Sequence, residues 1–234
     1  MVFDALKEAL LELIAPTRCA GCERPGSVLC ASCVAWIVRY RDTHPCPRCG
    51  APYGELVCTE CQGVDFAFDR VWCLGELDGP LARAVVIYKD AFEIRLGAEL
   101  GDMLAQRCLG QMASEGVTFD LVTWIPPTKH ALRRRGYDHA GILAQRVNRC
   151  LGVDGVQMLA RRPMRDLRHL SREQRSREVK DTYRWIEETV SVCGLSVLVI
   201  DDVMTTGSTL DGAARHLLAH GARTVTGAVL ARAW

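Results

Sequence analysis

The sequence predicts an α/β protein with a mainly parallel β-sheet covered by helices on both faces, preceded by a small cysteine-rich module. Two observations predict this fold. From about residue 64 onward, short apolar segments of strand length alternate with segments of helical spacing, a pattern typical of parallel sheets. Eight of the twelve cysteines lie between Cys19 and Cys61. We therefore expect two domains, residues 1–63 and 64–234.

Composition excludes several classes of protein. The 234 residues are 49% hydrophobic and 24% charged, with a formal net charge of +1, which is typical of a globular chain and not of a disordered one. No apolar run approaches the ~18 residues that a membrane-spanning helix needs. The first fifteen residues lack the basic start and the small-residue cleavage site of a secretory signal. We therefore expect a cytoplasmic protein whose thiols stay reduced.

The cysteine-rich region contains four Cys-x-x-Cys pairs. Two such turns can bring four thiolates to one tetrahedral zinc ion, whereas redox Cys-x-x-Cys motifs do not normally occur four in a row. We expect two structural Zn²⁺ ions, with sequential pairing preferred to a cross-brace because it needs the shortest loops. The expected ligands are Cys19, Cys22, Cys30 and Cys33 for the first ion and Cys46, Cys49, Cys58 and Cys61 for the second.

The remaining elements follow from the spacing of apolar residues. An amphipathic helix is expected at residues 3–14, because Pro16 ends its pattern. Further helices are expected at residues 80–88, 94–109, 138–150 and 208–220. Strands are expected at residues 68–74, 119–125, 156–159, 197–200 and 224–230.

Residues 197–209 are the most informative segment for function. An apolar strand runs into Asp201 and Asp202, and a loop rich in threonine, serine and glycine then leads into a helix. The backbone N–H groups of such a loop form an anion site at the carboxyl end of a strand. Two carboxylates beside an anion repel it unless they bind something else, and the hydroxyls of a sugar diol meet that need. We expect a ribose 5-phosphate cradle; a capped helix start with nothing bound is the alternative.

Residues 201–209, Asp-Asp-Val-Met-Thr-Thr-Gly-Ser-Thr, resemble the phosphoribosyl pyrophosphate (PRPP) binding motif of type I phosphoribosyltransferases. A domain of this kind joined to cysteine pairs resembles the ComF family, and the likeness covers nearly the whole chain. Further matching segments are residues 80–89, 125–129, 135–140 and 170–183. The chain departs from the family pattern at Asp138, His139, Leu167 and Glu178.

The resemblance implies a type I phosphoribosyltransferase-like domain that transfers a phosphoribosyl group to an unidentified acceptor and releases pyrophosphate. It implies that the catalytic residues are Asp201, Asp202, Lys89 and Arg135. The implied PRPP-binding residues are Asp201, Asp202, Val203, Met204, Thr205, Thr206, Gly207, Ser208, Thr209, Pro127, Thr128 and Lys129. Mg²⁺ is expected to arrive with PRPP, because it binds mostly through substrate oxygens.

Residues 129–177 form a basic block, with thirteen Lys/Arg against four Asp/Glu and a local net charge of +9. Its second half, residues 161–177, suits a lid over pyrophosphate, a nucleic-acid contact surface or a solvated loop. His130, His139 and His169 are expected to hydrogen-bond phosphate or backbone, with acid–base catalysis as the second choice.

The ComF resemblance also implies an alternative function. In it, the chain is a non-catalytic or nucleotide-sensing protein of DNA uptake. Its zinc module and basic segment bind single-stranded DNA and DNA-uptake proteins. A nucleoside monophosphate would then take the place of PRPP.

Overall fold

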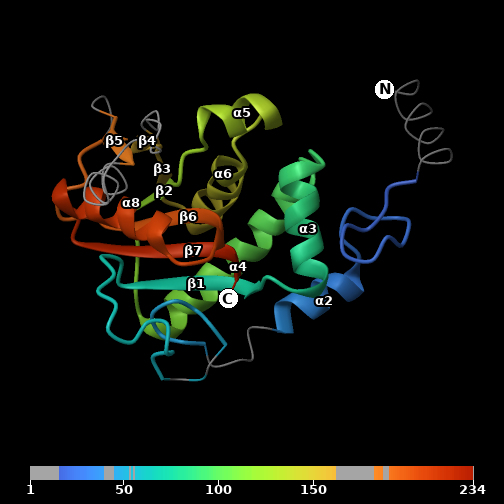
Figure 1. Cartoon of the computed structure of the whole chain (residues 1–234), viewed down its shortest axis with the longest axis horizontal. Coiled ribbons are helices and arrows are strands. Elements are labelled where there is room, and N and C mark those ends of the chain that lie inside the picture. The colour runs from blue at the N-terminus through green and yellow to red at the C-terminus, as the bar shows by residue number, and fades with distance from the viewer. Residues whose placement is uncertain are drawn as a thin grey trace, which may run out of the picture.

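A computed structural model describes residues 16–39, 45–52, 54, 56–161, 182–186 and 190–233. At its centre lies a parallel sheet with the strand order β1-β7-β6-β2-β3 (Figure 1). These strands are β1 (Arg70–Glu76), β2 (Leu121–Trp124), β3 (Asp154–Gly155), β6 (Ser196–Met204) and β7 (Thr224–Arg232). A small antiparallel sheet pairs β4 (Leu159–Arg161) with β5 (Tyr183–Trp185). The predicted α/β fold with a parallel sheet is confirmed.

Helices cover both faces of the sheet. On one face lie α3 (Gly79–Asp90), α4 (Leu96–Glu115) and α6 (His139–Leu151), and on the other lies α8 (Ser208–Ala219) (Figure 1). Alternate residues of β6 divide between the two cores: Leu198 and Ile200 pack with the first group, and Val197 and Val199 pack with α8. This double burial explains why the strand is apolar throughout.

Several strands begin or end at residues other than those expected from the sequence. The central strand β6 continues through both aspartates to Met204 because β7 runs beside it, pairing Asp201 with Val229 and Met204 with Arg232. The strand expected at residues 156–159 is wrong, since β3 ends at Gly155 and β4 begins at Leu159. The helix expected at residues 3–14 and the segment 162–177 lie outside the described residues.

A short helix, α5 (Lys129–Arg135), was not expected from the sequence. Its seven residues are all at least partly exposed, so they carry no apolar periodicity that could signal a helix. Thr128 begins the helix by accepting a hydrogen bond from the Ala131 amide (3.0 Å), and Gly136 ends it in the left-handed conformation (φ 76°).

The cysteine-rich segments pack at two separate places on the sheet domain. Residues 16–39, which include α2 (Ala31–Val38), lie beside α3, whereas residues 45–52 and 56–63 lie below β1 (Figure 1). Cys19 and Cys33 belong to the core under α3 and α4, and Cys46 and Cys49 belong to the core under α8. Both cysteine-rich segments thus share the hydrophobic cores of the sheet domain. The predicted domain boundary at residue 63 therefore stays a prediction from sequence composition.

Candidate functional site

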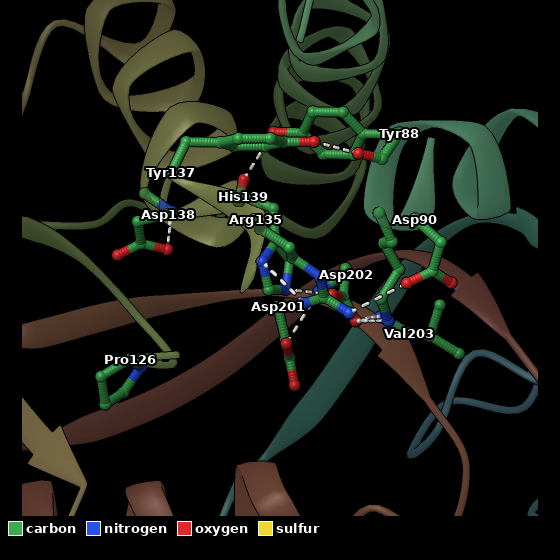
Figure 2. A network of polar contacts seen from close by, with 12 residues as sticks. Tyr88, Asp90, Pro126, Arg135, Tyr137, Asp138, His139, Asp201, Asp202 and Val203 are labelled. Atoms are coloured by element: carbon green, nitrogen blue, oxygen red, sulfur yellow. Dashed lines mark hydrogen bonds and ion pairs between the residues drawn. The ribbon is translucent and has the colours of Figure 1, made fainter. Parts of the chain in front are cut away.

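Asp201 and Asp202 occupy the carboxyl end of the central strand β6, and both are buried. Successive side chains of a strand point to opposite faces, so the two carboxyl groups have different surroundings, as Figure 2 shows. Each accepts a hydrogen bond from the next backbone amide: Asp202 N to Asp201 Oδ1 (2.8 Å) and Val203 N to Asp202 Oδ1 (2.6 Å). These bonds fix the direction of both carboxyl groups.

Asp202 faces α3 and α6 and is held by a lysine and a histidine. Lys89 Nζ, from the last turn of α3, lies 2.9 Å from Asp202 Oδ1, and His139 Nε2, from the first turn of α6, contacts Oδ2. Burial raises the pKa of Asp202, but the His139 hydrogen bond and the Lys89 charge outweigh it and lower the pKa to about 2. Asp202 is therefore ionised at neutral pH.

Asp201 faces the opposite side of the strand and behaves differently. Burial, followed by the charge of Asp202, raises the pKa of Asp201 to about 8, although Lys89 and Arg161 oppose this shift. Asp201 therefore carries a proton at neutral pH. An ionised carboxylate directly beside a protonated one is an arrangement found where neighbouring acids have different chemical tasks.

A polar network joins the helix ends around Asp202 (Figure 2). The Arg135 guanidinium lies 3.3 Å from His139 Nδ1 and 3.6 Å from Asp90 Oδ1. The Tyr88 hydroxyl donates to the His139 carbonyl (2.8 Å), and the Tyr137 hydroxyl donates to the Tyr88 carbonyl. The end of α3, the end of α5 and the start of α6 are thereby fixed around one carboxylate.

The structure thus brings three of the four predicted catalytic residues, Lys89, Asp201 and Asp202, to one place, and connects the fourth, Arg135, through His139. Lys89 pairs with Asp202 in this arrangement, whereas the sequence placed it at the pyrophosphate. The sequence missed the contact between His139 and Asp202. His139 is among the departures from the family pattern, and this departure is the feature of the sequence that could have drawn attention to it.

The predicted phosphate loop, residues 205–209, leads from β6 into α8. Thr205, Thr206 and Ser208 are exposed, and Thr206 Oγ1 lies 2.9 Å from Ser208 Oγ. Gly207 occupies the N-cap position of α8 with φ 79°. The Ser208 amide donates to Thr206 Oγ1 (3.4 Å). Glycine has no side-chain oxygen to cap the amides that follow, so this helix start suits an anion.

The second predicted binding segment, Pro127 to Lys129, follows β2. Because β2 pairs with β6 in parallel, with Trp124 beside Ile200, this segment emerges next to the two aspartates. Thr128 and Lys129 are exposed, and the side-chain oxygen of Thr128 caps α5. Arg161, which the sequence placed only in the basic segment, donates from Nε to the Pro126 carbonyl (2.9 Å) and thereby joins the site.

The eight cysteines form two separate clusters with the predicted sequential pairing. The first cluster is Cys19, Cys22, Cys30 and Cys33, the second cluster is Cys46, Cys49, Cys58 and Cys61, and the sulfurs of each lie within 4.8 Å of one another. Both are built alike: the Cys30 amide donates to Cys19 Sγ (3.2 Å) and the Cys58 amide to Cys46 Sγ (3.3 Å). Cross-brace pairing is excluded by this geometry.

The sulfur chemistry suits a metal ion. Burial raises the pKa of Cys19 and of Cys46, but hydrogen bonds from backbone amides outweigh it and lower the two pKa values to about 6 and about 7. These two thiols lose their protons readily, as metal ligands must, whereas burial raises the pKa of Cys33, Cys49 and Cys61. Four converging sulfurs, with no further donor in either group among the described residues, fit a closed, structural Zn²⁺ site.

Comparison with known proteins decides the family. Over 222 residues the chain is 31% identical to the DNA utilization protein YhgH of Salmonella typhi, covering 91% of this chain and 96% of the relative. It is 29% identical over 217 residues to the competence protein ComFC of Bacillus subtilis, covering 85% of this chain and 81% of the relative. The chain belongs to the ComF family.

The other comparisons concern the sheet domain of this ComF protein. A family model described as a phosphoribosyl transferase domain matches residues 131–233. Among solved structures, the chain is similar to a hypoxanthine phosphoribosyltransferase from Staphylococcus aureus, with 15% identity and a TM-score of 0.35 over 58% of this chain and 64% of that chain. The matched model spans the whole phosphate loop and both aspartates.

Within the part of the ComF chain that the structure describes, no helix is long and apolar enough to cross a membrane. The predicted cytoplasmic location is not tested by this observation and stays a prediction.

Replacing Gly207 by alanine should disrupt the phosphate loop. The new Cβ would lie 2.7 Å from Met204 Cε and 3.2 Å from Phe66 Cε1, at a residue with φ 79°, and a left-handed conformation costs a non-glycine residue roughly 1–2 kcal/mol. We expect lower thermal stability and weaker binding of phosphate ligands, measured by thermal unfolding and calorimetry. Gly110→Ala is the matched control, because its Cβ meets no atom within 4 Å and α4 should become more stable.

Proposed function

We propose that this ComF-family chain binds PRPP at the carboxyl end of β6 and transfers its phosphoribosyl group to an acceptor, releasing pyrophosphate. The observation that carries the proposal is the position of the two aspartates. They lie near the carboxyl end of the strand that leads into an exposed, hydroxyl-rich loop at a helix start. An anion at that loop and a sugar diol at the aspartates are the two halves of one ligand, a ribose 5-phosphate.

The geometry suggests how each group acts in this reaction. The ribose hydroxyls donate to the aspartates, and the buried charge of Asp202 stabilises the positive charge that develops on the sugar as its bond to pyrophosphate breaks. Lys89 and Arg135 are the cations nearest to Asp202 in the network described above, and they stabilise the leaving pyrophosphate when it is present. Mg²⁺ comes with the substrate and is held mainly by pyrophosphate oxygens.

The direct test is calorimetric titration of the zinc-loaded full chain with PRPP and MgCl₂, followed by an acceptor screen that measures pyrophosphate release. We expect saturable binding of PRPP and release that depends on one class of acceptor. Absence of any PRPP binding at millimolar concentration would rule out the proposed site. Binding without release for any acceptor would instead favour a sensor of PRPP or of a nucleoside monophosphate.

PRPP affinity should rise with pH. The ribose hydroxyls donate to an ionised carboxylate, so binding removes the proton that Asp201 carries below its pKa of about 8. The affinity should therefore increase with pH by up to about tenfold per unit and level off above pH 8. Calorimetry in buffers of different ionisation enthalpy should detect the released proton at pH 7. In Asp201→Asn this proton release should disappear, and its persistence would assign the pH effect to another group.

A second candidate function, single-stranded DNA binding, is favoured by the unexpected helix α5. Its exposed Lys129, Arg133 and Arg134 project cationic groups beside the candidate site, and two relatives are named for DNA utilization and competence. Phosphate contacts of this kind make affinity fall as salt rises. Fluorescence anisotropy with a labelled single-stranded oligonucleotide at several salt concentrations tests this DNA binding. An absence of binding at low salt would reject this second function.

A further inference from the structure

We propose that Arg232 connects the second cysteine cluster to the phosphate loop, so that a metal ion held by that cluster sets the conformation of the loop. The proposal rests on the proposed function only in taking this loop as the place where the ligand's phosphate binds. Arg232 is thus a positioning residue at the end of β7, and none of the sequence motifs pointed to it.

The first half of the connection joins Arg232 to the loop. The side chain is 3% exposed, and its Nη1 lies within hydrogen-bonding distance of the Met204 carbonyl (3.5 Å) and donates to the carbonyls of Thr205 and Ala233. Met204 and Thr205 are the residues at which β6 passes into the phosphate loop. The guanidinium therefore holds the backbone at the point that determines how the loop leaves the sheet.

The second half joins Arg232 to the cluster. Its Nη2 forms an ion pair with Glu60, which lies between the ligand cysteines 58 and 61. Its side chain also hydrogen-bonds Cys49, one of the four clustered cysteines. One buried guanidinium thus touches a predicted metal ligand, a carboxylate of the same segment and two carbonyls of the loop.

The charges explain why metal occupancy matters. Four thiolates and one Zn²⁺ carry a net charge of −2, and the single positive charge of a buried arginine offsets part of it. Without the metal, the four sulfurs are no longer held around one point, so the position of Cys49 beside Arg232 is no longer fixed. Glu60, whose side chain is half exposed, then remains as the carboxylate partner, and a pair reaching solvent holds the guanidinium less firmly.

The space around Arg232 shows that it is a principal connection between cluster and loop. A cavity of about 1050 Å³ lies between them, lined by Cys49, Glu60, Phe66, Thr205, Thr206 and Arg232 among others. A second link is supplied by residues 66 and 67, where the Ala67 amide donates to Asp211 Oδ1 in the first turn of α8 (2.7 Å). The cluster therefore reaches the loop through these polar contacts and through Phe66, whose ring lies against Gly207.

The first cysteine cluster provides an internal control. Its segment contacts α3, where Arg83 Nη1 lies 3.4 Å from the Gly21 carbonyl and the side chain of Pro80 packs against Gly21. Metal at this cluster should therefore support α3 without acting on residues 204–209.

Hydrogen exchange of the loop peptide tests the connection without any ligand. In the zinc-loaded chain, Cys58→Ser and Arg232→Met should each raise amide exchange in residues 204–209 by about tenfold, the size expected for losing a charge-assisted hydrogen bond. Cys30→Ser, the equivalent change in the first cluster, should leave amide exchange in residues 204–209 unchanged. Arg223→Met should also leave this exchange unchanged, because Arg223 lies at the opposite end of β7 and donates to Ser196 Oγ (2.8 Å). Unchanged loop exchange in Cys58→Ser would overturn the proposal.

A second measurement uses the reciprocity of coupled binding. If metal at the second cluster strengthens PRPP binding, PRPP must strengthen metal binding there by the same factor. We expect PRPP with MgCl₂ to protect one zinc per chain from a chromogenic chelator, and Arg232→Met to abolish this protection. If Arg232→Met does not fold, Arg232→Lys, which keeps the charge but not the fork of donors, should show reduced protection.

The two proposals fail in different ways. A wild-type chain that does not bind PRPP contradicts the proposed function, while the exchange experiment still decides the role of Arg232. A chain that binds PRPP but shows no zinc protection contradicts the role of Arg232 and leaves the proposed function standing.

Discussion

The double replacement of Asp201 and Asp202 by asparagine should abolish pyrophosphate release, lowering turnover by at least about 10³-fold. Each change removes a carboxylate that accepts a ribose hydroxyl and stabilises positive charge on the sugar, and losing one such electrostatic group commonly costs about 10²–10³ in rate. Asparagine retains the shape of aspartate, and its side-chain oxygen can accept the same backbone amides. We therefore expect a folded protein that neither binds nor turns over PRPP.

The control for this double variant is Asp120→Asn, which lies where the amino-terminal ends of the parallel strands meet. Asp120 Oδ2 accepts a hydrogen bond from the Ser196 amide (2.8 Å) at the start of β6, so the same chemical change is made near the same strand but far from its carboxyl end. Turnover should persist in this variant. Turnover that also persists in the double variant would mean that the aspartates are not the reacting site.

Removing metal should lower the thermal stability of the protein. Metal analysis should find two zinc ions per chain, and Cys22→Ser and Cys49→Ser should each lose one. Each cluster belongs to a hydrophobic core shared with the sheet, and structural zinc sites contribute folding free energy directly. Chelation should therefore lower the melting temperature of the sheet domain as well. The measurements are metal content and circular dichroism during thermal unfolding.

Cys150→Ser serves as the control for the metal prediction, because Cys150 is exposed and lies outside both clusters. This variant should retain two zinc ions and an unchanged melting temperature. A chain with a single zinc ion would show that one of the two clusters is held by protein contacts alone.

The features that could be predicted from the sequence are those whose residues all lie within one short segment. The Cys-x-x-Cys spacing identified both clusters, and one run of nine residues identified Asp201, Asp202 and the phosphate loop. Their chemistry needs neighbours within a few residues, so the pattern is visible without a fold. The apolar strands were equally visible, although the end of β6 was not, because β7 on a distant part of the chain decides how far β6 extends.

The features that could not be predicted depend on contacts between distant residues. His139 meets Asp202 and Arg232 meets Glu60 only after the sheet has formed, and the second pair is separated by 172 residues. A histidine in a basic segment and an arginine near the end of a strand each have many ordinary uses. Helix α5 was not predicted for another reason, because a short exposed helix has no apolar pattern in its sequence.

The strand order has a consequence for how the chain is made. β7, the last strand, lies between β6 and β1, which is the first. During synthesis from the N-terminus, β1 therefore lacks its neighbour in this sheet until β7 has left the ribosome. Pairing of β1 in the sheet should thus follow synthesis of β7, with the slow rate that non-local strand pairing imposes.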